Sequence, residues 1–538
     1  MQAPNSAGIL PREAVSEAAR RLAGVFDARH GGVSSGPNKF PPSMAMELLL
    51  REHHKAGERY PLSMVEKTLE AMARGGIYDQ LGGGIHRYST DPQWLVPHFE
   101  KMLYDEALVS SIYLEGFCAT GRKQFSDTAR GIFDYVLRNL QSEEGGIYST
   151  EDADSEGLEG KFYIWTLDEV EQILGQSLGE DARLFAAFYD VTERGNWNPP
   201  GDAHVPAGPK NILRILRPLE EVAKELRINP TEADRRLAEA RQKLFAEREK
   251  RVHPGLDDKI LAAWNGLMIA SLAKGSAVLD EPKYLDAAVR AAEFVLGRMQ
   301  QNGRLLRSYR KGRTHLMAYL DDYAFLIDAV LWLYEVTGNL RWLDEAERLM
   351  ATAITYFWDE AEGGFFFTAS DHEQLILRSK LATDNAIPSG NSVMIANLLR
   401  LSVLLDRADL REKAGEILAA FGGNAAQSPF AHERFLSGLE AWHEGFQEIA
   451  LVGDLQSPLA KQLLRVVYES YLPNKVVALL DPSWPEAAQL AEHVPLLTGK
   501  QPVKGKPTAF VCRNYACQSP TSDPETLRQQ LGTRDALY

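Results

Sequence analysis

The densest group of chemically capable side chains in this 538-residue chain lies in the segment GGGIHRYSTDPQWLVPHFEKMLYDEA, residues 82–107. Imidazole and carboxylate groups can transfer protons, and an indole can stack on the apolar face of a ligand. We therefore predict that part of this segment lines a site, with His86 and His98 as catalytic candidates. The substrate-binding candidates here are Arg87, Tyr88, Trp94, Glu100, Lys101, Tyr104 and Asp105. The alternative is an ion-pair network around an aromatic plug, because Lys101 and Asp105 share one face of the expected helix.

Two other segments place adjacent aspartates where a helix is expected to begin: LDDKILAAWNG, 256–266, and AYLDDYAF, 318–325. Two carboxyl groups that face each other can act as a general acid and as a base or nucleophile. We therefore predict Asp258 and Asp322 as catalytic candidates, with helix capping as the alternative. The neighbouring substrate-binding candidates are Asp257, Trp264, Asn265, Asp321 and Tyr323.

A further candidate segment is ATDNAIPSGNSV, residues 382–393, in which a proline precedes an expected helix. The free N–H groups at a helix start bind anions or sugar hydroxyls. Asp384, Ser389 and Asn391 are therefore substrate-binding candidates. Capping of the helix is the alternative explanation for Ser389.

The cysteines and the acidic loop predict neither a metal nor a cofactor. Three cysteines are too few for a disulfide framework, and the closest two are not a CxxC pair, so we predict structural roles in a reducing, cytosolic setting. These cysteines are Cys118, Cys512 and Cys517. In the loop EDADSEGLEG, Asp152 and Asp154 imitate a calcium loop, but Tyr163 stands at position twelve, which excludes an EF-hand. A weaker metal role for these two aspartates stays open.

The overall composition excludes several classes of partner. The formal net charge is -15, so there is no excess of basic residues for a general nucleic-acid surface. No run of apolar residues is long enough to span a membrane, and the first residues do not resemble a secretory signal. We predict a cytoplasmic protein without a nucleic-acid or membrane partner.

Apolar residues recur with the 3.6-residue period of a helix in twelve segments of the chain. The expected helices are 12–28, 43–54, 61–75, 97–119, 122–141, 258–279, 283–301, 318–336, 340–357, 389–405, 408–421 and 430–444. Many of these helices are separated by glycine pairs followed by short aromatic or β-branched runs. Pairs of helices recur at intervals of roughly 50–60 residues. Six helical hairpins of this kind predict a mainly α fold, an (α/α)6 toroid with a central mouth.

One internal match supports the repeat. Residues 103–121 align without a gap with residues 320–338, and we place Asp258 at the equivalent point of a third helix. These helices are richly apolar, as an inner ring requires, whereas the flanking helices carry more charge. The predicted toroid covers residues 1–445 with an insertion at about 150–256, which contains a KFYIW strand and helices near 167–189 and 230–251. Residues 446–538 alternate strand and helix, which predicts a small α/β appendage.

Six motifs together resemble the YyaL-like, spermatogenesis-associated thioredoxin-domain-containing family. They are GGGIHRYSTDPQWLVPHFEKMLYDEALV, EDADSEGLEGKFYIW, DDKILAAWNGLMIA, YLDDYAFLI, PSGNSV and FVCRNYAC. The resemblance implies a thioredoxin-like domain bearing a CHWCH-type motif. This sequence contains no such motif, so we assign no redox activity to it and expect a thioredoxin-like domain or another protein as a partner.

The helical part of that family is similar to N-acylglucosamine 2-epimerases and six-hairpin glycoside hydrolases, which implies carbohydrate chemistry by analogy of fold. His253-Pro254-Gly255 matches the start of an epimerase motif, but Leu256 and Lys259 replace its functional histidine and glutamate. His432 is a candidate for the late histidine of the epimerases. Because the paired aspartates suit hydrolases better, hydrolysis is favoured over 2-epimerisation.

Two functions remain open at the level of sequence. The first is a carbohydrate-processing enzyme that binds a sugar in the toroid mouth without a cofactor. The second is a non-catalytic binding or scaffold module, whose mouth the insertion would block.

Overall fold

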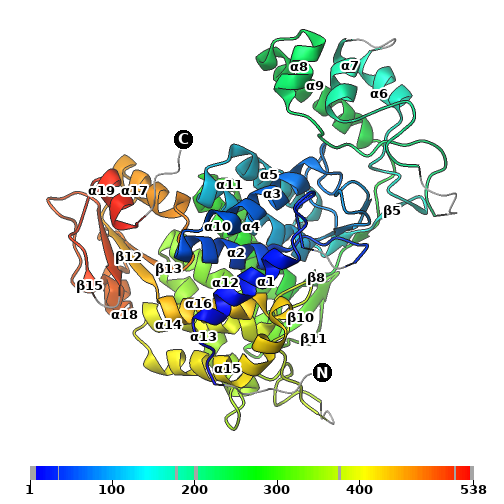
Figure 1. The fold of residues 1–538 in the computed structure, drawn as a ribbon. Helices are drawn as coiled ribbons and strands as arrows, with labels where there is room; N and C mark the ends of the chain where they lie inside the picture. The colour runs from blue at the N-terminus through cyan, green and yellow to red at the C-terminus, as the bar shows by residue number, and fades with distance from the viewer. Residues whose placement is uncertain are drawn as a thin grey trace.

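The computed structural model describes residues 8–33, 36–175, 180–198, 204–373, 377–513 and 516–532. Within these ranges it contains all twelve expected ring helices (Figure 1). Their bounds are α1 (Glu13–Gly24), α2 (Ser43–Ala56), α3 (Arg59–Arg74), α4 (Leu103–Thr120), α5 (Lys123–Tyr135, extended by a π-turn at Val136–Leu140), α10 (Ala262–Leu279), α11 (Pro282–Arg298), α12 (Leu320–Thr337), α13 (Leu340–Phe357), α14 (Gly390–Leu404), α15 (Ala408–Gln427) and α16 (Glu433–Glu444). No helix among the described residues is both long and apolar enough to cross a bilayer.

The helices form a closed (α/α)6 toroid, as the repeat predicts. The inner helices are α2, α4, α10, α12, α14 and α16; each packs on the next, and α16 returns to pack on α2. The outer helices α1, α3, α5, α11, α13 and α15 each cover an inner neighbour. Because the last inner helix contacts the first, the fold is a ring and not an open solenoid.

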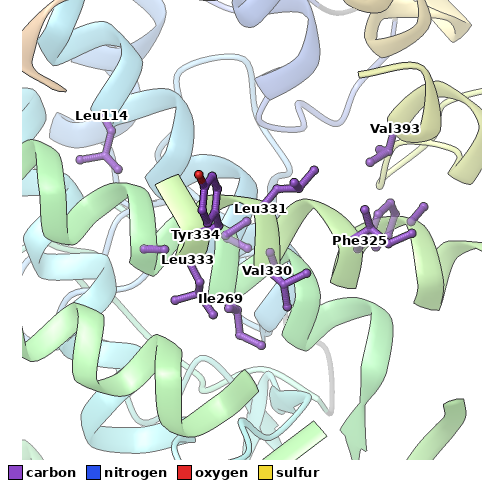
Figure 2. Close-up of a cluster of buried hydrophobic side chains, with 14 of the residues drawn as sticks. Leu114, Ile269, Phe325, Val330, Leu331, Leu333, Tyr334 and Val393 are labelled. Carbon is purple, nitrogen blue, oxygen red and sulfur yellow. The ribbon is translucent and has the colours of Figure 1, made fainter. Parts of the chain in front are cut away.

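The hydrophobic core lies between the two layers of helices. Figure 2 shows apolar side chains from four inner helices meeting in it. The labelled residues are Leu114 of α4, Ile269 of α10, Phe325, Val330, Leu331, Leu333 and Tyr334 of α12, and Val393 of α14. An inner helix is covered on most sides, which explains why its sequence is apolar nearly all round.

The closest approach of two inner helices gives a stability prediction. A Cβ atom on Gly266 of α10 would lie 2.6 Å from the backbone carbon of Phe325 in α12. Gly266→Ala should therefore lower the free energy of unfolding by about 1–3 kcal/mol. Gly297 near the end of α11 has no atom within 4 Å of such a Cβ, so Gly297→Ala should be neutral or stabilising by about 0.5 kcal/mol. Urea denaturation of both variants checks this, and equal effects would contradict the close packing of α10 on α12.

Two helix starts differ from the sequence-based prediction. Helix α4 begins at Leu103, as its match with α12 requires, but the expected helix began at residue 97. Helix α10 begins at Ala262 and not at residue 258, so Trp264, and not Asp258, is equivalent to Asp105. In both cases the preceding apolar residues form short strands paired with distant segments.

The glycine-pair loops are held to the inner helices by a recurring hydrogen bond. In three loops the residue directly after the glycines donates its N–H to a polar side chain near the start of the next inner helix, and in the fourth the donor, Leu305, lies two residues after the single Gly303. The pairs are Ile85 with Glu106, Ile147 with Asn265, Leu305 with Tyr323 and Phe365 with Asn391. Gly83, Gly84, Gly363 and Gly364 have positive φ, which allows these sharp turns.

Short strands join the loops around the N-terminal ends of the inner helices. They are β1 (Tyr88–Ser89), β2 (Pro97–His98), β3 (Lys101–Met102), β4 (Thr150–Glu151), β5 (Asp154–Ser155), β6 (Leu158–Glu159), β7 (Leu256–Asp257), β8 (Ile260–Leu261), β9 (Gln300–Gln301), β10 (Arg304–Arg310) and β11 (Arg313–Met317). The sheets have the orders β1-β2, β3-β4-β7, β5-β6 and β8-β10-β11, with β9 also on β10. The sheet β3-β4-β7 ties the segments before α4 and α10 together.

The insertion contains α6 (Leu167–Leu174), α7 (Glu180–Phe188), α8 (Leu219–Leu226) and α9 (Pro230–Arg248). These helices have a hydrophobic core of their own and project from the ring (Figure 1). The expected KFYIW strand is wrong, because Lys161–Tyr163 form a turn and only Trp165 makes an isolated bridge, to Asn211.

The C-terminal unit has the expected α/β character. It covers the ring on the side away from the insertion (Figure 1). Its elements are β12 (Gln447–Val452), α17 (Pro458–Glu469), β13 (Lys475–Leu480), α18 (Ala487–His493), β14 (Thr508–Arg513), β15 (Ala516–Cys517) and α19 (Pro524–Gln530). The sheet order is β13-β12-β14-β15, with β12 and β13 parallel. Cys512 and Cys517 form a disulfide between paired positions of β14 and β15. This differs from the prediction of cysteines in a reducing setting, because the β14–β15 pairing brings the two thiols together.

Candidate functional site

A cavity of about 160 Å³ lies on the axis of the ring, and all six inner helices line it. It is smaller than the roughly 300–1,000 Å³ of drug-sized sites, so it can enclose only a small ligand or part of a larger one. Its larger apolar lining residues include Met44, Leu108, Leu267, Trp332, Pro388 and Val393. Its charged lining residues are Glu47, Arg51, Glu115, Lys274, Asp328, Glu335, Arg400, Arg434 and Lys475.

Most of these charges are paired across neighbouring inner helices. Arg434 of α16 binds Glu47 of α2 at 2.6 Å, and Lys274 of α10 pairs with Glu115 of α4. Arg400 of α14 pairs with two carboxylates of α12; its partners are Asp328 and Glu335. The cavity wall is therefore polar and rigid, because each pair fixes two helices and two side chains at once.

The N-terminal ends of the inner helices gather at one mouth, where carboxylates cap neighbouring helices. Each carboxylate accepts a backbone N–H of the next helix over, a favourable position for negative charge. The bonds run from Ala263 N of α10 to Asp322 (2.9 Å), from Gly390 N of α14 to Asp321 (2.9 Å) and from Arg434 N of α16 to Asp384 (2.8 Å).

Several carboxyl groups at this mouth have raised pKa values. Burial, with the neighbouring Asp322, raises the pKa of Asp321 to about 7. Burial likewise raises the pKa of Asp384 to about 6 and, with Asp384 nearby, that of Glu433 to about 8. Burial also raises the pKa of Asp105, whose Oδ2 has no hydrogen-bond partner. Carboxyl groups that titrate near neutral pH are suited to general acid–base chemistry.

The structure does not bring the two predicted catalytic aspartates together. Asp258 lies outside the cavity and pairs with Arg310 of β10. Asp322 is fully buried and accepts from the backbone N–H groups of Ala263 and Tyr319. The capping alternative therefore accounts for Asp322, and its neighbour Asp321 is the more accessible carboxyl group of that pair.

The two predicted catalytic histidines have different environments. His86 is buried; its Nδ1 lies 2.9 Å from the carbonyl oxygen of Phe99, and burial together with the Lys101 charge lowers its pKa to about 3. His98 contacts Glu100 and Glu159, which raise its pKa to about 9 despite partial burial. At neutral pH His86 is thus a neutral core residue and His98 a cation.

The remaining residues of the first cluster build the loop and its packing. Arg87 pairs with Glu100 at 3.2 Å, and the ring of Tyr88 stacks on His98. Trp94 is fully buried and donates to a backbone carbonyl, so it offers no free face to a ligand. Of this cluster, Tyr104 and Asp105 belong to α4, one turn before the lining residue Leu108.

Lys101 is also placed differently from the prediction. It belongs to β3 and not to the α4 helix, and its side chain is 1% exposed. Its Nζ lies 2.9 Å from Asp79, which also accepts from Arg248 of α9 at 2.8 Å. This buried triad joins the insertion to the ring, so Lys101 is a structural residue.

The other predicted binding residues divide between the mouth and the loop contacts. Trp264 is partly exposed and packs edge-to-face on Tyr104, one turn before the lining residue Leu267. Asn265, Tyr323 and Asn391 are buried in the loop contacts described above. The others serve local structure: Ser389 caps α14, and Asp257 pairs with Lys259.

Sequence reasoning missed the residues that line the cavity. None of the predicted site residues is among them, and the lining contains charged groups and one indole but no imidazole within the described part of the chain. The sequence signal that could have indicated these lining residues was the presence of charged residues inside otherwise apolar helices. Asp328, Trp332 and Glu335 follow the helical spacing i, i+4, i+7 in α12, which places them on one face.

Possible metal ligands lie away from the cavity. Among the described residues, Asp344 and Glu347 of α13 and His493 of α18 are close enough to share an ion. Asp152 and Asp154 belong to no such group of described residues. His432 is buried, with its Nδ1 2.8 Å from the carbonyl oxygen of Ser428.

No protein-family model matches the chain, but curated relatives do. It is 36% identical over 534 residues to human spermatogenesis-associated protein 20, covering 94% of this chain and 67% of the relative. The rat protein of the same name has the same identity and coverage. An uncharacterized protein of Caenorhabditis elegans is 32% identical over 529 residues, covering 94% of this chain and 71% of the relative.

Solved structures with similar folds have low sequence identity. A GH76 alpha-mannanase of Bacteroides thetaiotaomicron is 11% identical with a TM-score of 0.46, covering 80% of this chain and 96% of that one. A cellobiose 2-epimerase of Spirochaeta thermophila is 15% identical with a TM-score of 0.31, covering 77% and 98%.

Proposed function

This chain belongs to the family of spermatogenesis-associated protein 20, and we propose that it is an enzyme acting on a carbohydrate that binds in the axial cavity and reaches its mouth. The observation that carries this proposal is the arrangement of the ring. A polar cavity with a partly exposed indole, Trp332, lies below a mouth of carboxyl groups that titrate near neutral pH. Indoles stack on sugar faces, and ionised pairs can bind hydroxyl groups.

We propose Asp321 as the proton donor of this reaction, acting on a bond at the mouth. It lies eleven residues before Trp332 on α12, about 16 Å along the helix, so the substrate must extend from the cavity to the mouth. Its pKa of about 7 leaves the carboxyl group largely protonated below neutral pH, and it lies at the mouth where α12 meets α14. Hydrolysis is favoured over 2-epimerisation because the titratable groups of the mouth are mainly carboxyl groups, whereas His86 and His432 are buried.

A thermal-shift screen with neutral and acidic mono- and disaccharides tests binding in the cavity. A sugar present at 100 times its Kd should add about 2.7 kcal/mol to the stability of the wild-type chain. Trp332→Leu should abolish this shift, whereas Trp484→Leu in the C-terminal unit should keep it. If no sugar raises the Tm, or if Trp332→Leu keeps the full shift, the sugar proposal is wrong.

A second function, docking of a protein partner, is favoured by exposed apolar side chains in the segments that precede the inner helices α2, α12, α14 and α16. Phe40, Leu316, Leu377 and Phe430 are 47–71% exposed. Single exposed residues are common, but several in such segments indicate a contact surface. We propose a thioredoxin-like domain as the partner to test first. Binding of such a domain without any sugar-induced shift would favour this function.

A further inference from the structure

The floor of the axial cavity comes from the C-terminal unit. The segment from Leu472 to Lys475 closes the ring at the end opposite the mouth. Arg51 of α2 donates to the side chains of Asn474 at 2.7 Å and Glu440 at 2.8 Å. Asn474 also donates to Glu440 at 2.8 Å. These bonds fix the residue that follows, Lys475, so that it lines the cavity.

Three cations from three different elements surround the indole of Trp332. Lys274 Nζ of α10 lies 5.7 Å from the ring centroid, Lys475 Nζ of β13 lies 5.8 Å from it, and Arg400 Cζ of α14 lies 5.3 Å from it. Cation–π attraction explains part of this arrangement. The floor of the cavity nevertheless concentrates positive charge around Trp332, the one indole among the lining residues that the structure describes.

One of the three cations lacks a counter-ion. Lys274 is paired with Glu115, and Arg400 is paired with Asp328 and Glu335. The ammonium group of Lys475 makes no ion pair or hydrogen bond with any residue that the structure describes. Glu335 and Glu115, the carboxylates whose charge acts on it, are already paired with Arg400 and Lys274. Burial lowers the pKa of Lys475 although the charges of Glu335 and Glu115 oppose this, because an ammonium group without a direct partner is costly to keep charged there.

We propose that the sugar bound in this cavity carries a carboxylate or phosphate group, and that Lys475 is its counter-ion. The inference rests on the proposed function and adds a substrate class, the uronic acids or sugar phosphates. The anionic oxygens would compensate Lys475 while the sugar ring packs on Trp332. A neutral sugar would leave the ammonium group without a partner, so the cavity favours the acidic ligand.

Calorimetric titration of the full chain tests this preference. The ligands are glucuronate, galacturonate, glucose 6-phosphate and mannose 6-phosphate, each compared with its neutral parent sugar. We expect at least one acidic sugar to bind at least tenfold more tightly than its parent. The carboxylate and phosphate arms show which anion the site takes.

Matched variants assign the effect to Lys475. Lys475→Met should reduce acidic-sugar binding at least tenfold, to the level of the neutral parent, and Lys475→Arg should retain most of it. Lys461→Met, on the exposed face of α17, should change nothing. Because Lys475→Met removes an uncompensated charge, its Tm without ligand should be unchanged or higher, which separates lost binding from lost folding.

Each result has a distinct meaning. Tighter binding of an acidic sugar that depends on Lys475 supports the inference. Equal binding of acidic and neutral sugars, or acidic binding that survives in Lys475→Met, overturns it and leaves the proposed function intact. Failure of every sugar to bind overturns both.

Discussion

Replacing Asp321 with asparagine is expected to lower turnover of the sugar substrate by about 100- to 10,000-fold, the usual contribution of a general acid. Substrate binding should change by less than about threefold, because the side chain lies at the mouth and the cavity walls are built from other residues. The amide keeps a similar shape and can still accept the hydrogen bond from Gly390 N. Steady-state kinetics and calorimetry on the same preparation separate the two effects.

The pH profile gives a second measure of the same role. The pKa of Asp321 is raised to about 7, so a required proton donor is lost as the pH rises through 7. Wild-type activity should fall above that pH, and the residual activity of Asp321→Asn should lack this limb. Asp258→Asn, which alters the carboxylate predicted from sequence, should change turnover by less than about twofold. A large loss in Asp258→Asn with none in Asp321→Asn would reverse the assignment.

Replacing Asp79 with asparagine is expected to lower the free energy of unfolding by about 3–5 kcal/mol. Asp79 is the shared anion of two buried cations, Lys101 and Arg248, and all three side chains are at most 4% exposed. Removing it leaves two charges without a counter-ion in a dry environment. Because Arg248 belongs to α9, the insertion should also loosen from the ring.

Urea denaturation, with the insertion followed separately by hydrogen exchange, checks this result. Lys101→Met in the Asp79→Asn background should recover part of the stability, because it removes one of the two uncompensated charges. The surface pair of Asp127 with Lys123 provides the control, and Asp127→Asn should cost less than about 0.5 kcal/mol. If Asp79→Asn lowers the free energy of unfolding by less than about 1 kcal/mol, water reaches the Asp79–Lys101–Arg248 cluster and the prediction is wrong.

The sequence predicted the ring well, because an inner helix must be apolar and an outer helix amphipathic. The match of residues 103–121 with 320–338 holds in the structure, since α4 and α12 have equal length and both end at a glycine with positive φ. The start of α10 was misplaced because residues 256–261 satisfy a helical period. Their pairing with β4 and β10 depends on segments far away in the chain.

The candidate site was harder to predict than the fold. Dense polar segments of the sequence predicted binding or catalytic residues. In the structure most of these residues hold loops in place, as Asn265 and Asn391 do. The cavity instead uses isolated charges such as Arg400 within apolar helices. Lys475 could not be placed by any local pattern, because its position depends on how the C-terminal unit docks on the ring.

The most direct test of the central claim, that the axial cavity is the ligand site, is a crystal structure of the chain with an acidic sugar that binds in solution. The account predicts electron density for one sugar ring on the face of Trp332, with its anionic group at Lys475. Density at another place on the molecule, with the cavity unoccupied, would contradict the account.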